Sequence, residues 1–167
     1  MTSNTISSVI HYSAADGANG SGTGFVWTAA MERALEEKIR LCDILEEIAD
    51  SLPDNIDKAR CLQIASVLVP VVRSTHRYEE EVIFPAYQSA LAEDTLPSPL
   101  KRLRSEHYED ECYADELTEA LLAVARGGDV KNAEAFGYML RAFFESVRRH
   151  VAFEREHVLP AIQAAYK

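Results

Sequence analysis

The chain has 167 residues, an apolar share of 47% and a formal net charge of −10. This length and composition suit one globular domain with a single core. The negative charge excludes nucleic acids and anionic membrane surfaces as expected partners, because both are polyanions. No apolar run approaches the roughly 18 residues of a membrane span, and the N-terminus lacks a secretory signal pattern, so we expect a cytoplasmic protein.

The first segment, residues 1–24, is rich in Ser, Thr, Asn and Gly and carries no sustained apolar period. We expect it to form a flexible arm ahead of a single domain at 25–167. From Phe25, apolar residues recur at steps of three and four as far as Leu52, which predicts a first helix. The sequence Leu-Pro-Asp-Asn at 52–55 is expected to end it.

A second helix is predicted to begin after Asp57 and to run to about Asp94. Pro70 and Pro85 fall inside its pattern as kinks or breaks. The three cysteines of the chain are far apart and have no Cys-x-x-Cys partner, which favours reduced thiols over a disulfide framework.

A third helix is predicted after the sequence DTLPSP, with Ser98 as a cap and Pro99 at the first helical position. It should continue to the Gly-Gly-Asp turn at 127–129. A fourth helix is expected from near Asn132 to Ala165. Glycine is scarce after the arm, strand-like alternation is absent and the connections are short. The predicted fold is therefore all-α, an antiparallel up-down four-helix bundle.

Histidine and glutamate recur at four-residue spacing on three of these helices. The segments HRYEEEVIFPA, from His76, and HVAFEREHVLPA, from His150, are imperfect copies of one pattern, and a third pair begins at His107. Residues four apart lie on one helix face about 6 Å from each other, so each pair is able to reach a common interior. The predicted metal ligands are His76, Glu80, His107, Glu111, His150 and Glu154.

The predicted ligands mix imidazole nitrogens with carboxylate oxygens, which suits iron, manganese or zinc. Iron fits best, because a structural zinc site typically recruits cysteine and closes at four ligands. Several carboxylates able to bridge ions favour a dinuclear centre. The neighbouring acids Glu79, Glu81 and Glu156 are interpreted as solvated helix charges.

These motifs resemble the hemerythrin family, in particular its bacterial HHE cation-binding domains, over about residues 27–166. The resemblance implies a bridged di-iron centre used for dioxygen binding, iron or oxygen sensing, or a response to nitric oxide. The residues that carry it are His76 and Glu80 before VIFP, Glu106-His107 with Glu111, and His150 and Glu154 before Leu159-Pro160.

The chain departs from the family in the first helix, where a further histidine is usual and Glu-Glu-Lys stands at 36–38. At about 100° per residue, the apolar stripe of this helix is centred near Lys38. We expect Lys38 to occupy the ligand position, with its ammonium paired to Glu80, Glu111 or Glu154; snorkelling to solvent is the alternative. Two iron ions are expected, and one or none are the alternatives that this lysine raises.

Three further side chains are candidates for supporting roles. His157 lies on the face of His150 and is either a replacement ligand, a neighbour of the ligands or a surface residue. Tyr78 and Tyr113 flank the site histidines and either donate to the site or pack at its rim.

Two functions follow from these patterns. The first is a non-enzymatic metal-binding sensor or carrier that takes a small diatomic ligand such as dioxygen or nitric oxide. The second is a metal-free structural or interaction module, in which Lys38 pairs with the cavity carboxylates. An oxidase is a third possibility, but no substrate-pocket pattern supports it, and the sequence names no protein partner.

Overall fold

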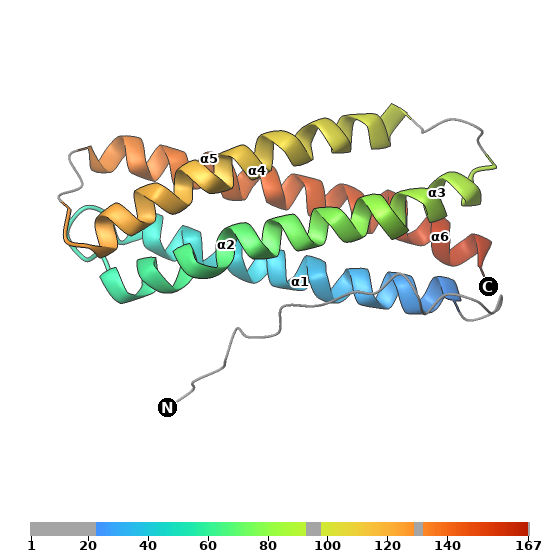
Figure 1. Cartoon of the computed structure of the whole chain (residues 1–167), viewed down its shortest axis with the longest axis horizontal. Coiled ribbons are helices and arrows are strands. Elements are labelled where there is room, and N and C mark those ends of the chain that lie inside the picture. Colours follow the sequence, from blue (N-terminus) through green and yellow to red (C-terminus); the bar gives the residue numbers. More distant parts are fainter. Residues whose placement is uncertain (1–22, 93–97, 129–131, 167) are drawn as a thin grey trace.

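The computed structural model describes residues 23–92, 98–128 and 132–166, and over these ranges it contains helices and no strands (Figure 1). Four long helical rods alternate in direction, so the predicted all-α antiparallel bundle is confirmed. The rods are α1 (Thr23–Asp50), α2 (Lys58–Tyr78) continued by η2 (Glu79–Ile83) and α3 (Phe84–Ala90), α4 (Ser98–Ala125), and α5 (Ala133–Phe153) continued by η3 (Glu154–Val158) and α6 (Leu159–Ala165).

The rods form a closed ring in which α1 packs on α2 and α5, and α4 packs on the same two helices. Apolar side chains at three- and four-residue steps fill the centre, as the periodicity predicts. Among the largest fully buried ones are Met31, Leu35, Leu45, Ile64, Leu68, Leu103, Leu117, Leu121 and Phe143. No helix in the described part of the chain combines the length and apolarity of a membrane span.

The helix ends follow the capping residues of the sequence. Asp57 caps α2 by accepting hydrogen bonds from the backbone N–H groups of Ala59 and Arg60. Asn132 caps α5 through the N–H of Ala135. After α4, Gly127 adopts a φ of +88°, a conformation that glycine enters without strain.

The expected boundaries differ from the observed ones in two places. The helix α1 already begins at Thr23, slightly before the predicted start at Phe25, and the rest of the expected arm, 1–22, lies outside the described residues. The rod that contains α2 ends its last helix at Ala90, and the predicted end near Asp94 lies outside the described residues.

Two of the prolines produce π-helical turns. Pro70 is accommodated inside α2, whereas Pro85 and Pro160 each stand just after a five-residue π turn. Proline has no N–H, and its ring clashes with the carbonyl four residues earlier, so the regular hydrogen-bond ladder cannot continue there. In each turn the residue before the proline instead donates its N–H five residues back, to Glu79 or Glu154. At Pro85, where the sequence predicts a kink or a break, the helix instead widens locally into a π turn.

Candidate metal centre

Six ionisable side chains from all four rods meet inside the bundle, and none is more than 3% exposed. The rods α1 and α4 contribute one each, and the other two rods contribute a histidine and a glutamate each. These residues are Lys38, His76, Glu79, His107, His150 and Glu154. Buried ionisable groups are rare unless they are paired or bind a ligand, so this cluster is the prime candidate for function.

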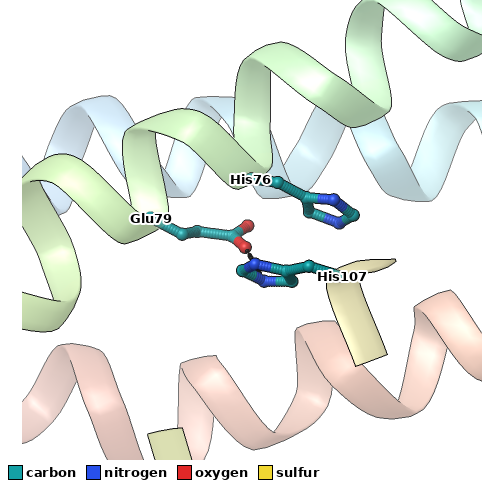
Figure 2. Close-up of side chains that lie close together, drawn as sticks. All are labelled: His76, Glu79 and His107. Atoms are coloured by element: carbon teal, nitrogen blue, oxygen red, sulfur yellow. Dashed lines mark ion pairs between the residues drawn. The ribbon is translucent and has the colours of Figure 1, made fainter. Parts of the chain in front are cut away.

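The three imidazole rings lie nearly parallel in a compact cluster. The centroids of His76 and His107 are 4.0 Å apart with an interplanar angle of 10°, and the His150 ring lies 5.1 Å from that of His107. Figure 2 shows His76 and His107 layered above one another, with the Glu79 carboxylate directed at His107. Rings from three helices therefore present their nitrogens to one small volume.

Glu79 is the central residue of the cluster. Its Oε2 lies 2.6 Å from His107 Nε2 and 3.7 Å from His150 Nε2, and its Oε1 accepts a 2.8 Å hydrogen bond from the Lys38 ammonium. It belongs to both described groups whose ligand atoms lie within 4.8 Å of one another: His76, Glu79 and His107, and Glu79, His150 and Glu154.

The interpretation of Glu79 as a solvated charge is wrong, because its side chain is fully buried. The sequence does hold a signal for it. Glu79 stands six residues before Pro85, as Glu154 stands six before Pro160. Alignment of the two segments on their prolines, rather than on their histidines, would have matched the two buried glutamates.

Glu80 and Glu111 lie at the edge of the site and not in its interior; each is about one-third exposed. They reach across to the histidine of the neighbouring helix: Glu80 Oε1 is 2.8 Å from His107 Nδ1, and Glu111 Oε1 is 3.1 Å from His76 Nδ1. The sequence paired each glutamate with the histidine of its own helix, whereas in the structure Glu80 pairs with His107 of α4 and Glu111 pairs with His76 of α2.

Each outer glutamate also contacts an arginine, so its charge is offset at the surface. Arg104 lies 3.4 Å from Glu80, and Arg73 lies 3.5 Å from Glu111. Glu106 completes the set, with Arg102 at 3.2 Å and with its Oε2 3.6 Å from His150 Nδ1. Three histidines are thus backed by three carboxylates, an arrangement that orients imidazoles in metal sites.

The electrostatics of the cavity keep Lys38 and Glu79 charged. Burial alone would lower the pKa of Lys38, but the carboxylates of Glu79, Glu154 and Asp110 outweigh it, and its pKa is raised. Burial likewise opposes ionisation of Glu79, yet the Lys38 ammonium and the neighbouring imidazoles hold the pKa of Glu79 well below its ordinary value. The two residues form a buried ion pair.

Glu154, His76 and His150 are held neutral. Burial and the nearby Glu79 charge raise the pKa of Glu154 well above its ordinary value. Burial and the Lys38 charge lower the pKa of His76, and they lower that of His150 to about 3. Neutral imidazole is the form that binds metal ions.

Unsatisfied polar atoms gather in this cavity. Of nine buried side-chain atoms in the described residues without a hydrogen-bond partner, six belong to it: Glu79 Oε2, His107 Nε2, both ring nitrogens of His150 and both oxygens of Glu154. If His107 Nδ1 donates to Glu80, the Nε2 lone pair points at the Glu79 oxygen 2.6 Å away. Two acceptors at this distance need a proton or a metal ion between them, and the imidazole nitrogens and carboxylate oxygens gathered here are donors that hold metal cations.

The remaining candidates lie further out. His157 is 56% exposed and faces Glu156, which places it on the surface. The Tyr78 hydroxyl donates to the backbone carbonyl of Trp27, and Tyr113 packs edge-on against Phe143.

Asp110 was not anticipated; it is 5% exposed, accepts from Ser146, and burial raises its pKa to about 6. Its place three residues after His107, on the same helix face, is the signal that could have found it.

An open pocket of about 280 Å³ reaches the cluster from the surface. It is lined by side chains of α2, η2 and α4, and it includes one of the three buried histidines. The lining residues are Arg73, His76, Arg77, Glu80, Glu81 and Glu111. The site therefore has a route to solvent beside its outer carboxylates.

The comparisons with known proteins agree with this geometry. The family model of the hemerythrin HHE cation-binding domain matches residues 31–162, which include every residue of the cavity. No curated protein and no solved structure gave a significant match. With most of its length matched, and with buried histidine and glutamate groups able to hold a metal ion, the chain belongs to the hemerythrin HHE cation-binding domain family.

Proposed function

We propose that this protein binds iron in the buried cavity and acts as a non-enzymatic carrier or sensor of dioxygen, nitric oxide or iron itself. The observation that carries the proposal is the close approach of His107 Nε2 and Glu79 Oε2, at 2.6 Å, with carboxylates backing the outer ring nitrogens. That arrangement supplies lone pairs to a cation and holds protons on the opposite side of each ring.

Iron is favoured by the chemistry of the donors. The cavity offers imidazole nitrogens and carboxylate oxygens but no thiolate, since burial raises the pKa of the nearby Cys42 thiol to about 12. Ferrous iron in such a site would supply reversible binding of a small diatomic molecule. The chain's own residues would hold the ion, fix the imidazole orientations and shield the ion from bulk solvent except on the side of the open pocket.

The test is reconstitution with ferrous iron under anaerobic conditions, followed by elemental analysis. We expect the unmodified protein to retain iron and the double variant His107→Ala, His150→Ala to lose it, because imidazoles from two helices are removed together. His157→Ala is the matched control, since that histidine is 56% exposed, and it should retain iron. Unchanged iron content in the double variant would refute the assignment.

The diatomic role is tested on the same iron-loaded protein. Addition of dioxygen or nitric oxide should change its visible absorption spectrum, and the double variant should show no such change. If the spectrum of the iron-loaded protein changes with neither gas, the diatomic role is refuted and iron itself is the signal that the protein senses.

A metal-free structural module is the second candidate, and the Lys38–Glu79 ion pair favours it, because an ammonium already neutralises the central carboxylate. In that case the unmodified protein should bind no ferrous iron at all.

A further inference from the structure

Lys38 places a buried positive charge inside the candidate metal centre. Lys38 lies in the middle of α1, twelve residues before its end at Asp50. At 1.5 Å per residue this is about 18 Å, further than a four-carbon stem extends. Its side chain is 2% exposed, so the ammonium does not snorkel to solvent. The lysine is a component of the cavity.

The ammonium occupies one oxygen of the carboxylate that both ligand groups share. Lys38 Nζ lies 2.8 Å from Glu79 Oε1, while Glu79 Oε2 faces the imidazoles of His107 and His150. If Glu79 is to bridge two ions through its two oxygens, Oε1 must be free. With Lys38 in place, only Oε2 is available to a cation.

The charge balance leads to the same conclusion. With the buried carboxylates ionised, Glu79, Glu154, Asp110 and Lys38 sum to two negative charges. One divalent ion neutralises the cavity, and two leave two positive charges. The outer carboxylates of Glu80 and Glu111 do not correct this excess, because Arg104 and Arg73 already offset them. An uncompensated charge in so buried a volume is strongly unfavourable.

We propose that the Lys38 ammonium takes the place of a second metal ion and limits the cavity to one divalent cation, held by Glu79, Glu154 and the imidazoles of His76, His107 and His150. This inference rests on the proposed iron binding and specifies its stoichiometry. It also assigns Lys38 a role that a histidine there would not have, because a lysine brings a fixed positive charge and no lone pair.

The experiment is metal stoichiometry, measured by elemental analysis after anaerobic loading with excess ferrous iron and removal of unbound metal. The unmodified protein should hold one ion per chain. Lys38→Met frees Glu79 Oε1 and removes the charge, so iron content should rise towards two. Lys38→Arg keeps the charge and should remain at one. Arg40→Met, two residues along α1 at a 73% exposed side chain, is the matched control and should also remain at one.

Lys38→His is a second gain-of-site variant, in case Lys38→Met does not fold, and it should likewise approach two ions. Electron paramagnetic resonance after oxidation gives an independent readout: an isolated ferric ion has a half-integer spin and a signal, whereas a coupled ferric pair is silent. We expect a signal from the unmodified protein and its loss in Lys38→His.

The possible failures differ from each other. Two ions in the unmodified protein would overturn the role of Lys38 while leaving iron binding intact. A folded Lys38→Met or Lys38→His that still holds one ion would also overturn it. No iron in the unmodified protein would remove both this inference and the proposed function.

Discussion

The buried ion pair between Lys38 and Glu79 should couple these two residues strongly in the stability of the metal-free protein. Both side chains are at most 2% exposed and their charged atoms are 2.8 Å apart. Removal of one partner leaves the other charge buried without its hydrogen-bonded counterion, which costs about 3–5 kcal/mol. We therefore expect Lys38→Met and Glu79→Leu each to lower the free energy of unfolding by about this amount. For a chain of this size that corresponds to a fall in Tm of about 6–20 °C.

The double variant Lys38→Met, Glu79→Leu should recover most of the loss, because an apolar pair of similar volume carries no desolvation penalty. Urea unfolding with a chelator present gives the four free energies of a double-mutant cycle. We expect a coupling energy of at least about 2 kcal/mol. Arg40→Met, which breaks an exposed pair with Glu36, should change stability by less than about 1 kcal/mol. Single-variant losses that simply add in the double variant would refute this account.

Three other predictions follow from the site. Glu80→Gln removes the carboxylate behind His107 and should weaken iron binding about 10- to 100-fold in a chelator competition, whereas Glu81→Gln, at an exposed neighbour, should leave it unchanged. The raised pKa of Glu154 keeps this side chain protonated in the metal-free cavity. Its recruitment as a carboxylate ligand should therefore release about one proton per ion, and metal affinity should fall as pH falls. Calorimetry in buffers of different ionisation enthalpy measures the number of protons released. In the folded protein a thiol reagent should modify the exposed Cys112 but not Cys42, whose pKa burial raises to about 12; equal rates would contradict the packing of α1.

The helices were predictable from sequence because their determinants are local. Apolar periodicity places the rods, and the caps at Asp57 and Asn132 mark two of their starts. The inward position of Lys38 followed from the same periodicity and is confirmed by its burial. Its partner is Glu79, however, and not one of the three glutamates expected.

The error over Glu79 arose from the restriction to four-residue spacing. Residues three and four apart both lie on the face of His76 in an α-helix, and in the structure Glu79 is fully buried whereas Glu80 is about one-third exposed. The exchange of outer carboxylates between α2 and α4 was also beyond the sequence, because the reach of Glu80 to His107 depends on how the two helices pack. The spacing of residues along one helix carries no information about how that helix packs against its neighbour.

The two π turns connect the cavity to one end of the bundle. Glu79 and Glu154 are the first residues of η2 and η3, and the short helices α3 and α6 begin where these turns end and pack on each other (Figure 1). The backbone at each buried carboxylate therefore runs without a break into the α3/α6 pair. The capped starts of α2 and α5 lie at the opposite end, separated from the carboxylates by regular helix. The two buried glutamates are thus joined to the α3/α6 end of the bundle through π turns, and to the capped end through α-helix.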